Sequence, residues 1–311
     1  MMKHLLTIDD LSPELVNFLI GQALSLKHRF ITNATIPHYP QSSLVNLFYE
    51  PSTRTRMSFE LAAKRLGMHV LNLHSHHSSA AKGESIHDTI YTIAAMDVNF
   101  LVIRHHQNGL PITIKDNLKN LAAHVTTHII NAGDGQNEHP SQALLDLMTI
   151  TEKKPNINAL KIVIIGDLRH SRVANSLQRL FKLLKIDNLV LVAPEAWQPQ
   201  IVHHGSTTNS LTTGLMRADV VIVLRIQHER FLENEHCDLA DYRKYYALTK
   251  ANIHLAKPNA LIMHPGPINR GLEIDDVIAD SNQSVILEQV QNGVYMRMAI
   301  LAFLTDQARN N

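Results

Sequence analysis

Short apolar runs alternate with helix-patterned segments along most of this chain. The clearest run covers residues 160–165, Leu-Lys-Ile-Val-Ile-Ile. In the segment that follows it, Val173, Leu177 and Leu180 fall on one helical face. Strands that are separated by helices pair in parallel, because the helix returns the chain to the end where the previous strand began. The sequence therefore predicts an α/β fold in which parallel sheets are flanked by helices.

The same pattern gives the expected position of each element. We expect strands at residues 44–49, 70–73, 100–103, 125–130, 160–165, 189–192, 220–224 and 260–263. We expect helices at residues 13–28, 85–95, 114–123 and 290–308, with others beginning after Thr53, at Pro140 and after residue 165.

A polar stretch that contains proline, between Thr151 and Ala159, is typical of a linker between two domains. We therefore expect one domain at residues 1–150 and another at 151–311, with the last helix packing back on the first domain. Open parallel sheets bind ligands beyond the carboxyl ends of their strands. We expect the active site in the cleft between the two domains.

Composition excludes several classes of protein. The 311 residues suit two domains, and 45% hydrophobic residues suffice for their cores. A net charge of +1 gives no broad positive field, so neither nucleic acid nor a membrane surface is an expected partner. The single cysteine, Cys237, excludes an intrachain disulfide framework. No apolar run near the first residues reaches the length of a signal or spanning segment, which favours a cytoplasmic location.

Twenty histidines raise the question of a metal site. The cluster His74-Ser75-His76-His77 lies in a polar stretch, and His124 and His128 lack the neighbouring glutamate of zinc-hydrolase motifs. We expect neither a metal site nor a cofactor. Nucleotide binding is also disfavoured, because the sequence after residue 165, Gly166-Asp167-Leu168-Arg169, lacks the glycines that let a pyrophosphate approach.

The segment Ser52-Thr53-Arg54-Thr55-Arg56 has the character of an anion-binding site. It lies where a predicted strand gives way to a helix, so Ser52 or Thr53 is the expected N-cap. A helix N-terminus carries partial positive charge, and arginines in its first turn are electrostatically unfavourable unless an anion binds there. A solvated surface helix is the alternative, but the density of hydroxyls and arginines favours a phosphate site.

Further polar residues follow predicted strands. Arg104 follows residues 100–103, and Arg225 and Gln227 follow residues 220–224. Each arginine taken alone could form a structural ion pair, but two separated arginines, Arg172 and Arg225, suit a substrate with two carboxylates.

The loop at residues 131–142 contains two glycines and leads into a helix that begins at Pro140. This places His139 at the cap and Gln142 in the first turn, where both can contact a ligand. A histidine that merely caps its helix is the alternative.

These segments resemble the aspartate and ornithine carbamoyltransferase family, and they occur in the family's order. Residues 52–56 resemble its carbamoyl-phosphate signature, and residues 131–142 resemble its second characteristic segment. Ornithine enzymes typically carry His-Cys-Leu-Pro and Asp-x-x-x-Ser-Met-Gly motifs. This chain has His264-Pro265-Gly266-Pro267 instead, and it lacks the second motif. The resemblance thus implies transfer of the carbamoyl group from carbamoyl phosphate to L-aspartate, the committed step toward pyrimidines.

The resemblance also implies residue roles. The carbamoyl-phosphate site would comprise Ser52, Thr53, Arg54, Thr55, Ser78, Lys82, Arg104, His139, Gln142, Gly266 and Pro267. The aspartate site would comprise Lys82, Arg172, Arg225 and Gln227. Catalysis would depend on Arg54, Thr55, Lys82, Arg104 and His139, with Thr55, Arg104 and His139 polarising the carbamoyl oxygen.

In the family, the serine and lysine that match Ser78 and Lys82 come from a neighbouring subunit, which implies a homotrimer. The pair Ala80-Ala81 departs from commoner forms of this loop, so Ser79 could replace Ser78. A regulatory chain or a dihydroorotase-like partner is compatible with the resemblance. The rival interpretations are a carbamoyltransferase that acts on ornithine or an acylated relative, and a noncatalytic anion-binding or assembly subunit.

Overall fold

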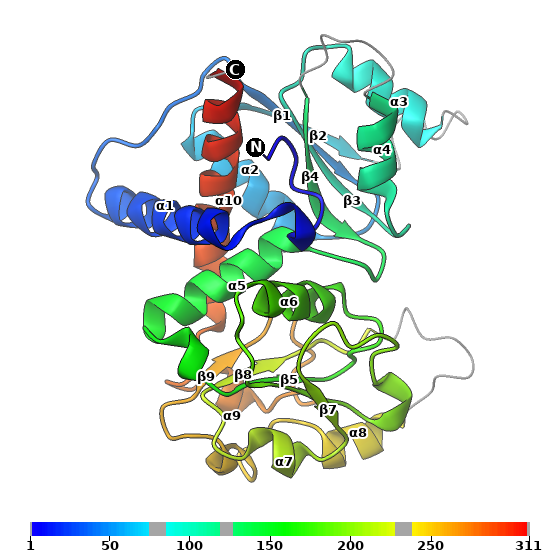
Figure 1. The fold of residues 1–311 in the computed structure, drawn as a ribbon, viewed down its shortest axis with the longest axis vertical. Coiled ribbons are helices and arrows are strands. Elements are labelled where there is room, and N and C mark those ends of the chain that lie inside the picture. Colours follow the sequence, from blue (N-terminus) through cyan, green and yellow to red (C-terminus); the bar gives the residue numbers. More distant parts are fainter. Residues whose placement is uncertain (1, 75–84, 119–126, 228–237, 310–311) are drawn as a thin grey trace. The chain divides into compact units, whose positions relative to one another are not determined.

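The computed structural model describes residues 2–74, 85–118, 127–227 and 238–309. The chain divides into two compact units, both of which are drawn in Figure 1. Unit 1 comprises Met1–Leu144 and Asn292–Asn311, and unit 2 comprises Leu145–Gln291. The predicted domains at 1–150 and 151–311 stay a prediction.

Unit 1 is built around a four-stranded parallel sheet with the strand order β2-β1-β3-β4 (Figure 1). The strands are β1 (Ser43–Phe48), β2 (His69–His74), β3 (Phe100–His105) and β4 (His128–Asp134). The helices that lie wholly or partly in this unit are α1 (Pro13–Ile31), α2 (Thr53–Arg65), α3 (Ile86–Ala94), α4 (Leu110–Leu118), α5 (Pro140–Lys153) and α10 (Ile286–Arg309).

Alternation along the strands builds the core of unit 1. Val45 and Leu101 lie on a sheet face that packs against Ile90 of α3 and Ile114 of α4. Helix α2 contacts β1 and β2 and buries an apolar face that includes Phe59, Ala62 and Ala63. Apolar contact with the sheet thus fixes the helix that carries the anion-binding motif.

A buried arginine of the last helix also holds α2. Arg297 of α10 donates from Nη1 to the Ser58 hydroxyl at 3.0 Å, and its guanidinium lies 4.9 Å from the centre of the Phe59 ring. Its Nη2 donates to the hydroxyl of Ser141, near the start of α5, at 3.5 Å. The end of the chain therefore contributes to the positions of both helices.

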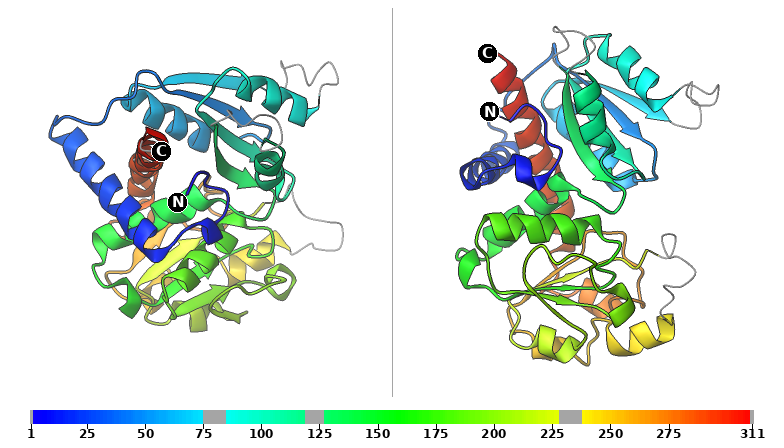
Figure 2. Two further views of the ribbon diagram at one scale, coloured as in Figure 1. Left: turned by 45° about the horizontal axis from the view of Figure 1, so that its top comes forward. Right: turned by 45° about the vertical axis from the view of Figure 1, so that its right-hand side comes forward.

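Unit 2 contains a five-stranded parallel sheet with the strand order β7-β6-β5-β8-β9. The strands are β5 (Ile162–Ile165), β6 (Leu189–Val192), β7 (Ser206–Thr208), β8 (Val220–Val223) and β9 (Leu261–Met263). The helices confined to this unit are α6 (Arg172–Leu183), α7 (Leu211–Leu215), α8 (Leu239–Tyr245) and α9 (Asp276–Ala279). Figure 2 shows α6 on one side of the sheet and α7 and α9 on the other, which explains why every residue of β5 is buried.

The sequence predicted these strands in order, except for β7, and the differences lie at element ends. Strand β3 extends to His105 because Phe48 of β1 still pairs with Arg104, although the apolar run stops at Ile103. Helix α4 begins at Leu110, directly after Gly109, which has a positive φ of 75°. The predicted helix at 114–123 and strand at 125–130 lie partly outside the described residues.

Strand β7 and helices α7, α8 and α9 were not predicted. They have three, five, seven and four residues, too few for a clear period. Within the described residues, no helix is both long and apolar enough to cross a membrane. The cytoplasmic location stays a prediction.

A matched pair of leucines tests the packing of unit 2. Leu191 of β6 is fully buried, whereas Leu287 of α10 is 81% exposed. We expect Leu191→Ala to lower the free energy of unfolding by about 2–5 kcal/mol, because it leaves a cavity between sheet and helices. Leu287→Ala should change it by no more than about 0.5 kcal/mol. Urea denaturation at equal protein concentrations measures both, and equal losses would contradict the described packing.

Candidate active site

Three segments of unit 1 meet at the carboxyl edge of its sheet. Directly after β1, the amide of Tyr49 donates to the carbonyl of Arg104 at 2.9 Å. Directly after β4, the amide of Gly135 donates to the carbonyl of His105 at 2.8 Å. The connection into α2, the end of β3 and the loop before α5 therefore lie together, as the parallel fold predicted.

Hydroxyl groups and arginines gather at the start of α2. Ser52 occupies the N-cap position, but its side chain makes no capping hydrogen bond, and no acidic residue lies in the first turn. Thr55 is buried and Arg54 is exposed. Helix N–H groups, hydroxyls and arginine cations thus gather without a carboxylate in that turn, an arrangement that suits a phosphate.

Arg104 is held in place from two sides. Its Nη1 donates to the carbonyl of Ala132 at 3.2 Å, and its Nε lies 3.4 Å from Oε2 of Glu50. The side chain is 15% exposed, so the pair is partly desolvated and orients the guanidinium. Sequence reasoning did not select Glu50, although its place between a strand and the phosphate motif was the available signal.

A buried carboxylate fixes the loop before α5. Asp134 is 1% exposed. Its Oδ1 accepts from the amide of Glu138 at 3.0 Å and from Asn131 Nδ2 at 2.9 Å. Its Oδ2 accepts from the amide of Gly109 at 2.8 Å and from Asn137 Nδ2 at 3.0 Å. These four hydrogen bonds hold the loop in one conformation, and sequence reasoning did not identify this role of Asp134.

The loop delivers His139 and Gln142 to the helix start as predicted. The His139 carbonyl accepts from the amides of Gln142 and Ala143 at 3.0 and 3.3 Å, and Pro140 is the first residue of α5. His139 and Gln142 are 4% and 8% exposed.

His105, next to Arg104, is a neutral histidine. Its ring stacks on that of His106 at 4.1 Å between centroids, and its Nδ1 accepts from the amide of Gln107 at 3.0 Å. Burial, and to a smaller extent the charge of His106, lower the pKa of His105 from 6.5 to about 4, while Glu50 opposes the shift. Arg104, and not His105, therefore supplies the positive charge at this strand end near pH 7.

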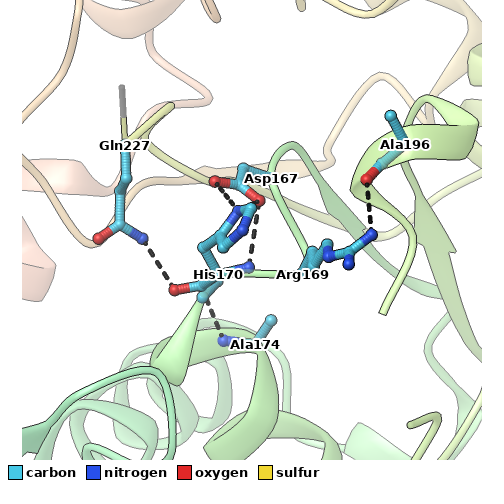
Figure 3. Close-up of polar contacts among 7 residues, drawn as sticks. Asp167, Arg169, His170, Ala174, Ala196 and Gln227 are labelled. Atoms are coloured by element: carbon cyan, nitrogen blue, oxygen red, sulfur yellow. Dashed lines mark hydrogen bonds and ion pairs between the residues drawn. The ribbon is translucent and has the colours of Figure 1, made fainter. Parts of the chain in front are cut away.

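In unit 2, a buried pair fixes the connection from β5 to α6 (Figure 3). Asp167 and His170 are 0% and 3% exposed, and His170 Nδ1 lies 2.9 Å from Oδ1 of Asp167. Gln227 Nε2 donates to the carbonyl of His170 at 3.3 Å, whereas Arg169 points away toward the carbonyl of Ala196. The connection is thus joined to the segment that follows β8.

Arg172 begins α6, directly after this connection, and is 4% exposed. The preceding Ser171 caps the helix by accepting from the amide of Ala174 at 3.2 Å. Arg225 follows β8 two residues before Gln227. The predicted aspartate-binding residues Arg172 and Gln227 are therefore attached to neighbouring loops.

Gly266 and Pro267 follow β9, and the peptide bond between them is cis. The same turn reaches the segment after β8, because Asn269 Nδ2 donates to the carbonyl of Ile226 at 3.3 Å.

Three of the predicted site residues lie outside the described part of the chain: Ser78, Ser79 and Lys82. Among the residues that are described, no three His, Cys, Asp or Glu side chains cluster so as to hold a metal ion.

Comparison with known proteins identifies the family. Residues 3–152 match the family model "Aspartate/ornithine carbamoyltransferase, carbamoyl-P binding domain", and residues 158–304 match "Aspartate/ornithine carbamoyltransferase, Asp/Orn binding domain". The aspartate carbamoyltransferase catalytic subunit of Legionella pneumophila (strain Paris) is 54% identical over 97% of this chain and 99% of its own length. The chain belongs to the aspartate/ornithine carbamoyltransferase family. The corresponding subunit of Coxiella burnetii (strain CbuK_Q154) is 45% identical over 96% of this chain and 94% of its own.

Solved structures of family members share the fold. Aspartate transcarbamoylase from Trypanosoma cruzi in complex with carbamoyl phosphate and aspartate has a TM-score of 0.84 and 29% identity, covering 96% of this chain and 95% of that chain. Its complex with N-(phosphonacetyl)-L-aspartic acid has a TM-score of 0.86 and 28% identity over 96% and 94%. Ornithine carbamoyltransferase from Pyrococcus furiosus has a TM-score of 0.82 and 27% identity over 96% of both chains. Both branches of the family therefore have this architecture.

The pKa of His105 can be measured directly. We expect the NMR titration of its imidazole to have a midpoint near pH 4, because the folded protein excludes water from the ring. The unfolded chain binds this proton below about pH 6.5, so the free energy of unfolding should fall as the pH drops from about 6.5 to about 4. His105→Asn, which keeps an acceptor for Gln107, should identify the resonance and weaken this pH dependence. A midpoint near 6.5 would contradict a buried neutral ring.

Proposed function

We propose that this chain transfers the carbamoyl group of carbamoyl phosphate to the amine of L-aspartate, giving N-carbamoyl-L-aspartate and phosphate. The observation that carries the proposal is the 54% identity, over nearly the whole length of both proteins, to an aspartate carbamoyltransferase catalytic subunit. The fold alone does not separate the two branches, since the Pyrococcus furiosus ornithine enzyme shares it.

The family resemblance implies the residue roles in unit 1, and the charge and placement of these residues support them. The phosphate is held by the start of α2 and the end of β3, through Ser52, Thr53, Arg54, Thr55 and Arg104. Thr55, Arg104 and His139 donate to the carbamoyl oxygen, whose negative charge grows as the amine attacks the carbon. Preoriented donors of this kind contribute about 3–4 kcal/mol each to stabilisation of a transition state. Gln142 binds the carbamoyl amide.

Unit 2 supplies the second substrate site. Arg172 pairs with the α-carboxylate of L-aspartate, and Arg225 and Gln227 bind the side-chain carboxylate. The carbonyls of Gly266 and Pro267 accept from the carbamoyl amide. The attack forms the C–N bond, the bond between the carbamoyl carbon and the phosphate oxygen breaks, and phosphate leaves with the proton that the amine loses.

A product assay on the purified protein tests the reaction. Carbamoyl phosphate is supplied with L-aspartate or with L-ornithine, and the carbamoylated product is identified by mass. We expect carbamoyl-aspartate, and we expect Arg54→Ala to lower kcat by about 10²–10³-fold, because the leaving phosphate, which gains charge as its bond to carbon breaks, loses a donor. Arg29→Ala, at an exposed arginine of α1, is the matched control and should retain full activity.

Each outcome of that assay is informative. Citrulline as the product would place the chain in the ornithine branch. Absence of any product, with carbamoyl phosphate still bound, would mean a noncatalytic or partner-dependent subunit.

We further propose that the active enzyme is a homotrimer in which Lys82, with Ser78 or Ser79, acts in the site of a neighbouring subunit. Two exposed apolar side chains of α2 support a subunit interface there. Met57 and Leu61, one turn apart on this helix, are 59% and 42% exposed. Exposed apolar side chains that lie together are typical of a protein–protein interface.

Mixing two inactive variants tests the sharing of sites. If Arg54 and Lys82 act in one site but come from different chains, a trimer reassembled from Arg54→Ala and Lys82→Ala chains contains sites without either substitution. We expect the mixture to recover activity that neither variant has alone. Sedimentation should give a mass near three times 35.0 kDa. A mixture as inactive as its parents, with mixed trimers demonstrated by mass, would contradict shared sites.

A further inference from the structure

A buried pair of side chains that has no role in the proposed chemistry is joined to the Gly266–Pro267 turn by hydrogen bonds. His264 and Glu273 both have fully buried side chains, and His264 Nε2 lies 3.2 Å from Oε1 of Glu273. The two residues come from opposite ends of the segment that contains the turn. Their contact therefore closes the base of this segment.

The hydrogen bonds determine how the imidazole is protonated. His264 Nδ1 accepts from the amide of Gly266 at 2.8 Å, so that nitrogen carries no proton. The ring proton is then on Nε2 and is donated to Glu273. The ring thus has two different functions, since one nitrogen holds the Gly266 amide and the other holds the carboxylate.

The same carboxylate oxygen fixes the far side of the turn. Glu273 Oε1 also accepts from the backbone amide of Asn269. Its second oxygen, Oε2, has no hydrogen-bond partner among the described residues. Burying a carboxylate whose oxygen lacks a partner costs free energy, and a well-packed apolar side chain would avoid that cost. A contribution to stability alone therefore does not explain why a carboxylate occupies position 273.

The network extends to both sides of the turn. The backbone amide of His264 donates to Gln289 Oε1 at 2.8 Å, and Gln289 Nε2 donates to Asp146 Oδ1 at 2.8 Å. On the other side, the Asn269 side chain donates to the carbonyl of Ile226. Ile226 stands between Arg225 and Gln227, which are the proposed partners of the side-chain carboxylate.

We propose that His264 and Glu273 are positioning residues of the reaction. They hold the turn so that the carbonyls of Gly266 and Pro267 meet the carbamoyl amide, and through Asn269 they set the place of Arg225 and Gln227. This assignment rests on the proposed function of those four residues. In this proposal, the side chains of His264 and Glu273 contact neither substrate. They fix the position of the backbone carbonyls that contact the carbamoyl amide.

Paired substitutions separate the two halves of the imidazole. His264→Asn keeps an acceptor for the Gly266 amide and loses the donor to Glu273, whereas His264→Gln keeps the donor and loses the acceptor. Glu273→Gln keeps Oε1 as an acceptor, and Glu273→Leu removes it. We expect Glu273→Leu to lower kcat on the order of 10²-fold, the effect of displacing a binding group by about 1 Å. Glu273→Gln should recover most of that loss, and each His264 variant should fall between the two.

The Michaelis constants give a readout that simple destabilisation would not move. The KM for L-aspartate should rise with the loss of kcat, because Arg225 and Gln227 shift. The KM for carbamoyl phosphate should change far less, because unit 1 holds the phosphate. Rates are expressed per active site, counted by titration with N-(phosphonacetyl)-L-aspartate, so that unfolded protein does not contribute.

Asp219→Leu is the matched control. Asp219 is 6% exposed and accepts from Lys257 Nζ at 2.8 Å, but it lies directly before β8, at the end opposite Arg225. This variant should lower Tm while leaving kcat and both KM values unchanged.

Suppose that the wild-type protein forms carbamoyl-aspartate, and that Glu273→Leu and both His264 variants keep its kcat and KM per active site. That result would overturn the positioning role but not the proposed function. A wild-type protein that forms no carbamoyl-aspartate would overturn the proposed function, and the positioning role with it.

Discussion

Parallel strand pairing is the constraint on which the rest of this structure depends. Every strand of a parallel sheet ends at the same edge, so residues that are far apart in sequence are gathered wherever a strand stops. In unit 1 this edge collects the start of α2, Arg104 and the loop that carries His139. In unit 2 it collects the segments that follow β5, β8 and β9. The hydrogen bonds between neighbouring strands are enough to bring these residues to one edge, so their side chains need not contact each other.

A second feature recurs at three of these connections, where a buried carboxylate holds the loop from within. Asp134, Asp167 and Glu273 are each at most 1% exposed, and each accepts at least one backbone amide of its own loop. A loop cannot satisfy its own amides as a helix or a sheet does, so a side-chain acceptor replaces the missing partners. The donors and acceptors of these loops are thereby held in fixed orientations, and preoriented groups of this kind can stabilise charge that develops in a transition state.

Much of this could be predicted from the sequence, for identifiable reasons. The run before Gly166 and the periodic segment after it gave β5 and α6, and Pro140 marked the start of α5 and the cap position of His139. Prediction was weaker where polar residues continue a strand, as in β3, and where an element such as β7 is too short to show a period. The supporting roles of Glu50, Asp134 and Glu273 were not found, since a buried carboxylate and a solvated one look the same in a sequence. Tertiary contact alone distinguishes them.

The division of the chain has a consequence for its synthesis. Unit 2 is one continuous stretch, Leu145–Gln291, whereas unit 1 needs both Met1–Leu144 and Asn292–Asn311. The ribosome therefore completes the second unit's sequence before the first unit's, although the first unit's strands emerge earlier. Until Arg297 emerges, Ser58 and Ser141 lack the guanidinium that holds them in the finished protein. Nascent chains therefore lack this contact of unit 1 until after the whole sequence of unit 2 has been synthesised.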